Sequence, residues 1–379
     1  MASVRILHAS DLHICTVSNL TSPVDRITAG TFFDAVVHGI LVSSYDVSVL
    51  QRFADFVYQQ AARGLLHAVV LTGDIATTGE REDLSKALEF FKAKPDFRLS
   101  TQTTEQEPTL AGISIPLFLL PGNHDRYRTG PGYAPGGLGY GPGGRVFDDV
   151  FDDYWREPVM PILDLRNEVH DYGFHTKGSD SHTESSPNPS PQPSNPSTKV
   201  LDYAPIRNGG LAVAIISADF NLLTSDHCDT PFGWLAQGKA YEDILDLLEE
   251  TTNTIVDSWG ESNQLCVIWA VHFPPSFPHV SRLMRLIDSD KFIRSANRCR
   301  VNAVLAGHTH DPVRYRRPEM KFDVFCAGTV SQAFAPCSNH FRILEIKNDS
   351  GEISIASEDY LFRKFPRGII TNRSGFYRL

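Results

Sequence analysis

Five short apolar runs, each followed directly by polar residues, are the feature of this sequence that most constrains its fold. The runs cover residues 4–9, 68–72, 116–120, 265–271 and 301–306, and the polar residues that follow them are Asp11 and His13, Asp74, Asn123, His124 and Asp125, His272, and His308 and His310. In an open α/β sheet, ligands bind just beyond the carboxyl ends of the strands. Because each run is typical of a buried strand, the sequence predicts that these side chains meet in one crevice.

The segments between these runs predict a layered α/β architecture. Apolar residues recur at helical spacing between residues 48 and 64 and again over residues 239–259. Further strand-like runs lie at residues 211–217 and 324–327. Residues 341–347 and 352–358 alternate apolar and polar side chains around an Asn-Asp-Ser-Gly turn, which predicts an antiparallel hairpin. Strands that alternate with helices favour sheets covered by helices.

Two segments interrupt this pattern. Residues 129–144 are too rich in Gly and Pro for regular structure, and residues 177–199 are almost entirely Ser, Pro, Asn, Asp and Thr. A segment so poor in apolar residues cannot bury enough surface to order itself, so we expect residues 177–199 to be a mobile insertion. Residues 129–144 are either a spacer or a loop over the crevice. We expect one domain over residues 1–360 that contains both segments, and a C-terminal extension over residues 361–379.

The charge balance and the cysteines exclude several classes of protein. The 379 residues include 35 Lys and Arg against 45 Asp and Glu, a net charge of −10, which does not favour nucleic acid as a partner. No run approaches the roughly 18 apolar residues of a membrane span, and the amino terminus lacks the features of a signal peptide, so we expect a cytoplasmic protein. The six cysteines are scattered without a C-x-x-C pair, which indicates neither a disulfide framework nor a thiolate zinc site.

The residue types in the crevice predict metal binding. Asp, His and Asn without Cys offer oxygen and nitrogen ligands that suit Mn, Fe or Zn. Seven such residues (Asp11, His13, Asp74, Asn123, His272, His308 and His310) are too many for one tetrahedral ion. They suit two ions about 3.5–4 Å apart that share a carboxylate, an arrangement that clamps a phosphoryl group. Any one motif alone is more typical of a turn, a helix cap or a core histidine, so the prediction depends on the ordered set.

Three glycines support the same prediction. Gly73, Gly122 and Gly307 each precede a candidate ligand at the point where a strand becomes a turn. A residue without a Cβ atom lets the main chain approach the crevice closely.

The ordered motifs D-x-H, G-D, G-N-H-D, H and G-H-x-H resemble the signature of the calcineurin-like metallophosphoesterase superfamily over residues 4–347. The resemblance implies a four-layer α/β/β/α sandwich with two mixed sheets and a pair of divalent metal ions (Mn, Fe or Zn) at one edge. Carried over by position, it implies three groups of ligands. Asp11, His13 and His310 would bind the first ion, Asn123, His272 and His308 the second, and Asp74 would bridge the two.

The resemblance also implies a mechanism in which a metal-bridging hydroxide attacks phosphorus. His124 would then stabilise the transition state or protonate the leaving oxygen, and Asp125 would help to orient His124. An alternative is that His124 only supports the ligands. Many relatives have Asp where this chain has Thr77, and Thr77 offers no negative charge to raise the pKa of the histidine.

Within the superfamily, residues 73–80 (GDIATTGE) and 272–275 (HFPP) are similar to the class III cyclic-nucleotide phosphodiesterase branch, although members often have a second histidine where this chain has Phe273. Thr78 replaces an Arg that is usual in protein phosphatases, which argues against a phosphoprotein substrate. The resemblance therefore implies hydrolysis of a phosphodiester in a small phosphorylated substrate, with cyclic nucleotides as the leading candidate. A nuclease, a phosphomonoesterase, a lipid-pathway pyrophosphohydrolase and a non-catalytic metal-binding scaffold stay open as alternatives. The oligomeric state also stays open, with a homodimer as one option.

Overall fold

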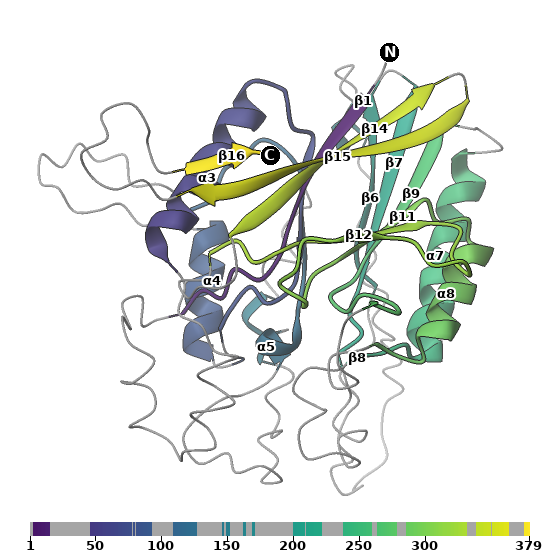
Figure 1. Ribbon diagram of the computed structural model, residues 1–379, viewed down its shortest axis with the longest axis horizontal. Helices are drawn as coiled ribbons and strands as arrows, with labels where there is room; N and C mark the ends of the chain where they lie inside the picture. The colour runs from purple at the N-terminus through teal and green to yellow at the C-terminus, as the bar shows by residue number, and fades with distance from the viewer. Residues whose placement is uncertain are drawn as a thin grey trace, which may run out of the picture.

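The computed structural model describes most of the segments in which the sequence predicts strands and helices. The described residues are 3–15, 46–77, 79, 81–92, 109–126, 146–147, 149–151, 162–163, 169–170, 200–208, 210–221, 238–259, 264–278, 286–331, 339–349, 351–363 and 375–379. They contain two six-stranded sheets that lie face to face, with helices on both outer sides (Figure 1). The segments 129–144 and 177–199, for which the sequence predicts insertions, lie outside the described residues.

The first sheet has the strand order β16-β15-β14-β1-β2-β3. Its strands are β1 (Ser3–Ala9), β2 (Ala68–Thr72), β3 (Leu117–Leu120), β14 (His340–Asp349), β15 (Glu352–Arg363) and β16 (Gly375–Arg378). Strands β1, β2 and β3 are parallel, whereas β14, β15 and β16 pair antiparallel, so the sheet is mixed. The predicted hairpin is therefore confirmed as β14 and β15, and both strands are longer than their alternating pattern.

The second sheet has the strand order β12-β13-β11-β9-β7-β6. Its strands are β6 (Val200–Asn208), β7 (Leu211–Ala218), β9 (Leu265–Ala270), β11 (Ala303–Ala306), β12 (Arg314–Tyr315) and β13 (Asp323–Cys326). The four inner strands are parallel, and β6 and β12 pair antiparallel at the two edges. Two short ribbons, β4 (Ile162–Leu163) with β5 (Val169–His170) and β8 (Gly238–Lys239) with β10 (Leu286–Ile287), complete the strands described.

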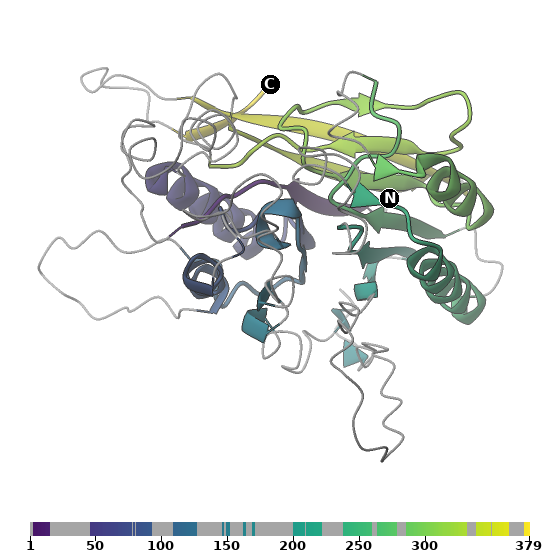
Figure 2. The same cartoon turned by 90° about the horizontal axis from the view of Figure 1, so that it is seen from below.

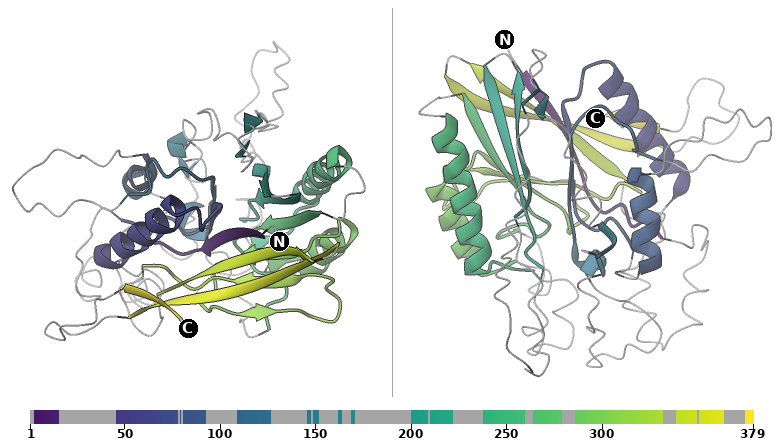
Figure 3. Two further views of the ribbon diagram at one scale, coloured as in Figure 1. Left: turned by 90° about the horizontal axis from the view of Figure 1, so that it is seen from above. Right: turned by 180° about the vertical axis from the view of Figure 1, so that it is seen from behind.

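Helices α3 (Val47–Ala62) and α4 (Arg81–Lys92) cover the outer face of the first sheet, and α7 (Glu242–Trp259) and α8 (Ser289–Arg298) cover that of the second (Figures 2 and 3). The sequence predicted α3 and α7 from their periodicity but not α4 and α8. In α3, the carboxylate of Asp46 accepts hydrogen bonds from the main-chain N–H groups of Ser48 and Val49, and Gly64 follows the helix with a φ of 66°. The predicted four-layer α/β/β/α sandwich with two mixed sheets is confirmed.

Strand β2 shows how the layers are held together. Ala68 and Val70 point into the core between the two sheets, whereas Val69 and Leu71 point toward α3 and α4. All four side chains are buried, as expected for a parallel strand covered on both faces. This burial on both faces explains why the run is continuously apolar instead of alternating.

The carboxyl ends of the parallel strands bring the polar segments together. The main-chain N–H groups of Asp11 and His13 donate to the carbonyl oxygens of Gly73 and Asp74 at 2.9 and 3.0 Å, so the segments after β1 and β2 stay paired beyond the sheet. In the second sheet, the N–H of Gly307 donates to the carbonyl of His272 at 3.0 Å. These ends lie on the side of the sandwich where Figure 1 labels the short helix α5 (Asn123–Arg126) and β8.

The carboxyl terminus contributes to the first sheet. Strand β15 runs past residue 360, and Leu361 pairs with Tyr377 of β16. The division into a domain over residues 1–360 and an extension over residues 361–379 stays a prediction. None of the helices that the structure describes combines the length and the apolar character that a membrane crossing requires.

Candidate metal centre

Two groups of ligand atoms lie at the carboxyl ends of the strands. The ligand atoms of Asp11, His13, Asp74 and His310 lie within 4.8 Å of one another, as do those of Asp74, His272 and His308. Asp74 belongs to both groups, as expected for a carboxylate shared by two cations. Of the nine residues predicted for the site, His124 and His310 are half-buried and the other seven are buried, so solvent reaches the groups from the side of these two histidines.

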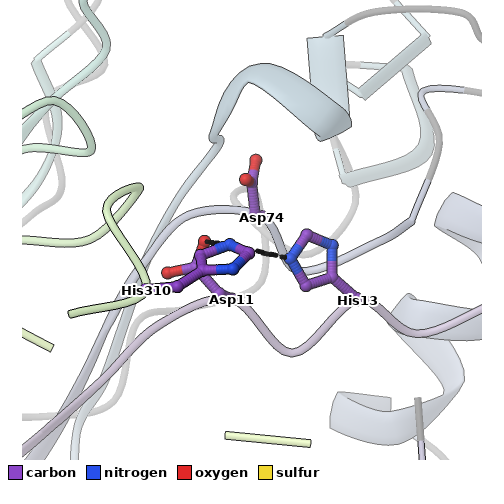
Figure 4. A group of neighbouring side chains, drawn as sticks. All are labelled: Asp11, His13, Asp74 and His310. Carbon is purple, nitrogen blue, oxygen red and sulfur yellow. Dashed lines mark hydrogen bonds and ion pairs between the residues drawn. The ribbon is translucent and has the colours of Figure 1, made fainter. Parts of the chain in front are cut away.

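The first group is built around Asp11. Its Oδ1 atom lies 3.0 Å from Nε2 of His310 and 3.9 Å from Nε2 of His13. The two Nε2 atoms are themselves 3.4 Å apart, and Figure 4 shows the two rings turned toward each other beside the carboxylate. Two imidazole nitrogens at this distance cannot both carry a proton, so at least one presents a lone pair, which is the form that binds a cation.

The second group is built around His272. Its Nε2 atom lies 3.4 Å from Oδ2 of Asp74 and 3.0 Å from Oδ1 of Asn123, while its Nδ1 lies 2.6 Å from the carbonyl oxygen of Thr72. An Nδ1–H that donates to this carbonyl leaves Nε2 to face the carboxylate and the amide oxygen. Such a hydrogen bond on the far nitrogen fixes the tautomer and ring orientation of metal-binding histidines.

The pKa shifts fit a site that holds cations. Burial, followed by the neighbouring His124, lowers the pKa of His13 to about 3, and burial followed by His272 lowers that of His308 to about 3, so both imidazoles are neutral at neutral pH. Burial alone would raise the pKa of Asp74, but His272 and His124 hold it well below its usual range. Burial would likewise lower the pKa of His272, but Asp74 raises it to about 9.

These protonation states leave two buried carboxylates, Asp11 and Asp74, beside the neutral imidazoles of His13 and His308. Buried carboxylates need compensating positive charge, because the protein interior solvates a charge poorly. The donor set of carboxylate, imidazole and amide groups therefore fits two divalent cations, with no thiolate among the described ligands.

The main chain at the site is strained. Of the eight non-glycine residues with a left-handed φ among those described, five are candidate ligands, with φ between 51° and 70°. These five are Asp11, His13, Asp74, His308 and His310. The left-handed conformation costs a residue with a Cβ atom roughly 1–2 kcal/mol, and such strain concentrates at functional sites. No pattern in the sequence indicated it.

The three glycines have the role that the sequence predicted. A Cβ atom on Gly73 would lie 2.7 Å from the main-chain nitrogen of Gly122, and one on Gly122 would lie 2.7 Å from Cε1 of His272. One on Gly307 would lie 2.9 Å from the carbonyl oxygen of Thr72. Each glycine lets two main-chain segments, or a segment and an imidazole, approach more closely than a side chain would permit.

His124 lies in α5, at the open side of the first group. Its main-chain N–H donates to Oδ1 of Asp74 at 2.8 Å, and its ring stands edge-on to that of His13, with the ring centres 4.9 Å apart. Its Nδ1 lies 2.9 Å from the main-chain carbonyl oxygen of Thr77. The carbonyl of Thr77 therefore orients the imidazole through a neutral acceptor, at the position where many relatives have a carboxylate.

Asp125 is buried and fixes the main chain on both sides of the site. Its carboxylate accepts hydrogen bonds from the main-chain N–H groups of Ile75, Ala76 and Gly122, at 3.1, 2.7 and 2.8 Å. Burial and then the charge of Asp74 raise its pKa to about 7, although the three N–H groups oppose the shift. Asp125 thus holds the segment that carries His124, whereas the sequence predicted that it would help to orient the imidazole itself.

Arg126 links α5 to the segment that follows β7 in the second sheet, and no motif in the sequence indicated this contact. Its Nε and Nη2 atoms donate to Oδ2 of Asp219 at 2.9 and 2.6 Å, and its guanidinium lies over the ring of Phe147. Oδ1 of Asp219 accepts from the main-chain N–H of Asn221, whose side-chain amide also donates to the carbonyl of Pro121. An arginine at the end of a short helix is usually exposed, so no local signal distinguished it.

A comparison with known protein families finds a match over most of the chain. A family model described as "Calcineurin-like phosphoesterase" matches residues 4–312. No protein with a curated description matches the chain.

Solved structures similar to this chain share little sequence with it. A dimetal phosphatase from Danio rerio is 13% identical with a TM-score of 0.48, covering 94% of this chain and 95% of its own. GAP50, the anchor in the inner membrane complex of Plasmodium, is 12% identical with a TM-score of 0.42, covering 100% and 89%. Phosphopantetheinyl hydrolase from Mycobacterium tuberculosis is 12% identical with a TM-score of 0.33, covering 86% and 90%.

Asp74 and His272 lie so close to Gly122 that a side chain at this position should disturb the metal ligands as well as the stability of the fold. We expect Gly122→Ala to lower the free energy of unfolding by about 1–3 kcal/mol, because its Cβ atom meets Asp74 and His272, and to lower the metal content per chain. Gly112→Ala is the matched control, since Gly112 has a φ of 77° but open space around its Cβ position. It should cost about 1 kcal/mol and leave the metal content unchanged. Equal metal content in the two variants, measured by inductively coupled plasma mass spectrometry, would contradict the role of Gly122.

The pair of Arg126 and Asp219 predicts strong coupling between the two sheets. We expect Arg126→Gln or Asp219→Asn alone to cost about 1.5–3 kcal/mol, because either change removes a charge-assisted hydrogen bond between two nearly buried side chains. The double variant should lose less than the sum of the two single losses, as measured in a denaturant double-mutant cycle. The exposed pair of Arg52 and Asp55 is the control, with an expected coupling below about 1 kcal/mol. Additive losses at the first pair would show that it does not join the sheets.

Proposed function

We propose that this chain, which belongs to the calcineurin-like phosphoesterase family, hydrolyses phosphodiester bonds in small molecules at a centre of two divalent metal ions. Members of the family are hydrolases that act on phosphoric esters and use two divalent metals. The observation that carries the proposal is the carboxylate of Asp74, which belongs to both groups of ligand atoms.

In the proposed assignment, Asp11, His13 and His310 hold the first ion, Asn123, His272 and His308 hold the second, and Asp74 contacts both. The distances in the two groups support this division, and the Nε2–Oδ1 distance of 3.0 Å brings Asn123 beside His272. Manganese, iron and zinc all suit these ligands. When bound, the two cations supply the Lewis acidity that stabilises negative charge on a phosphoryl group during in-line displacement.

His124 is the proposed donor of a proton to the leaving oxygen. The hydrogen bond from its Nδ1 to the carbonyl of Thr77 leaves Nε2 as the free nitrogen of the ring. The imidazole is half-buried at the open side of the centre, where a substrate enters. The acceptor at Nδ1 is a neutral main-chain carbonyl.

Cyclic nucleotides are the leading candidate substrates, on the strength of the segments 73–80 and 272–275. The acidic balance of the chain, −10 overall, supports a small substrate over a nucleic acid. A panel of cyclic nucleotides, dinucleotides, glycerophosphodiesters and phosphomonoesters, each assayed with added manganese, tests this choice. Selective hydrolysis of phosphomonoesters would show that the protein is a phosphatase and not a phosphodiesterase. Nicking of a plasmid would favour a nuclease.

Loss of the shared carboxylate should remove both ions. We expect Asp74→Asn to reduce manganese-dependent hydrolysis of bis(p-nitrophenyl) phosphate by at least about tenfold, because the centre loses the ligand common to both groups. Chelation of the wild-type protein should abolish hydrolysis, and manganese should restore it. Asp55→Asn, on the exposed face of α3, is the control and should behave as wild type. A smaller loss in Asp74→Asn, or a wild-type protein that binds no metal, would count against the proposal.

His124 should matter most where the leaving group is poor. In a series of aryl phosphodiesters, we expect His124→Gln to lose about 10²-fold or more in kcat for the most basic leaving group and much less for p-nitrophenolate. The slope of log kcat against the pKa of the leaving group should therefore become steeper. His67→Gln is the control, because His67 directly precedes β2, at the opposite end of this strand from Asp74, and its Nδ1 accepts a hydrogen bond from the main-chain N–H of Arg5. An equal loss across the series would indicate that His124 does not protonate the leaving oxygen.

A further inference from the structure

Phe273 directly follows His272 and is fully buried. Its ring stands edge-on to the imidazole of His272, with centres 4.9 Å apart and planes at 81°, and to that of His308, at 4.8 Å and 62°. The two imidazoles are 5.0 Å apart at 64°. The three rings, here called the Phe273 triangle, therefore contact one another pairwise.

The main chain at Gly238 packs closely against the ring of Phe273, so the ring cannot move away from the two histidines. A Cβ atom on Gly238 would lie 2.6 Å from Cγ of Phe273 and 2.7 Å from the carbonyl oxygen of Phe220. Gly238 is fixed in β8, which pairs with β10 and forms a bridge with Asn221. Because Gly238 has no side chain, the ring of Phe273 can lie directly against the main chain at this position. This contact surface, formed by Gly238 and the carbonyl of Phe220, is here called the seat.

An aromatic core surrounds Phe273 on the side away from the two histidines. Phe273 belongs to the same buried cluster as Phe220, Phe292 and Trp269. The ring of Phe292 stands edge-on to those of Phe220 and Trp269, with centres 5.7 and 5.5 Å apart. The ring contacts described for Phe273 are with His272 and His308 and not with Phe292, so the Phe273 ring is held by the main chain at Gly238 and by the two imidazoles.

We propose that Phe273 positions the imidazoles of His272 and His308 for the second metal ion. The inference rests on the proposed two-metal function. His272 is restrained at Nδ1 by the carbonyl of Thr72 and on its ring edge by Phe273, so only Nε2 is left to bind the ion. The main-chain N–H of His308 donates to Oδ2 of Asp11, and the imidazole ring of His308 packs against the ring of Phe273.

The apolar character of the ring has a second consequence. The side chain of Phe273 can neither form a hydrogen bond nor bind a metal ion. Within the triangle, only the imidazole nitrogens of His272 and His308 can therefore act as ligands. An aromatic ring also excludes water from that side of the imidazoles, which strengthens their interaction with a charge. Residues that orient metal ligands typically change metal affinity 10–100-fold when they are replaced.

The test measures metal binding directly. We expect Phe273→Leu to weaken the second Mn²⁺ ion about 10–100-fold in Kd, with the first ion unchanged, in titrations followed by calorimetry and by electron paramagnetic resonance. The metal content after gel filtration should fall from two equivalents toward one. Hydrolysis should return when Mn²⁺ is raised, which a general loss of structure would not allow. Phe273→Met, which nearly conserves volume, should shift Kd in the same direction and covers the case that the leucine variant folds poorly.

Phe292→Leu is the matched control. It removes a fully buried ring from the same core, and the ring contacts described for Phe292 are with Phe220 and Trp269. It should lower the free energy of unfolding as Phe273→Leu does, yet leave the affinity of the second ion unchanged. Wild-type affinity in the Phe273 variants, or equal weakening in Phe292→Leu, would overturn the inference. Failure of the proposed function would differ, because the wild-type protein itself would then bind fewer than two ions or would bind two without hydrolysis.

Discussion

The burial of two carboxylates beside each other is the constraint on which the rest of the structure depends. Asp11 is fully buried and Asp74 is 1% exposed, and each would be costly in the interior without positive charge nearby. The charge of Asp74 raises the pKa of His272 to about 9, so a protonated imidazole lies beside this carboxylate at neutral pH. Divalent cations supply the same compensation in a stronger form, since they can satisfy both carboxylates and leave the imidazoles neutral. The strands, the turns and the packed rings then serve to hold these charges at one edge.

Holding the ligands so closely requires strain, and the surrounding main chain compensates for it. Left-handed conformations at His308 and His310 aim two imidazoles from one short turn toward different groups of ligand atoms. Such conformations persist only where neighbouring structure fixes them. Here the segments after β1 and β2 remain hydrogen-bonded to each other, and the carboxylate of Asp125 binds three main-chain N–H groups beside them. The site is therefore rigid because its supports are main-chain hydrogen bonds, which require no particular side chain on the donor.

Much of the fold and the positions of the candidate ligands could be predicted from the sequence, because both depend on local patterns. A buried parallel strand is a continuous apolar run, and its carboxyl end is marked by the first polar residue, as at Ala9 and Asp11. The rest depends on tertiary contacts. In the sequence, Phe273 is only an aromatic residue that follows a histidine. Its contacts with Gly238 and His308 are visible only in the folded structure. The pairing of Arg126 with Asp219, which lie 93 residues apart, has no local signature. Helix α4, with Glu82, Asp83 and Lys92 near its ends, is polar enough to resemble a loop in sequence.

His124 has the main-chain carbonyl of Thr77 as its hydrogen-bond partner where many relatives have a carboxylate. This difference bears on which groups at the site can stabilise negative charge. A histidine paired with a carboxylate gains stability as an imidazolium, whereas His124 is paired with a neutral oxygen. The next carboxylate along the chain, Asp125, is occupied by main-chain N–H groups, so it does not replace the missing charge at the imidazole. In the proposed mechanism, bound cations would then stabilise most of the charge on a leaving oxygen, which would make the geometry of His272 and His308 more important. A fixed aromatic ring behind these two imidazoles supports that geometry, since it adds rigidity to the second group of ligands without adding a proton or a charge.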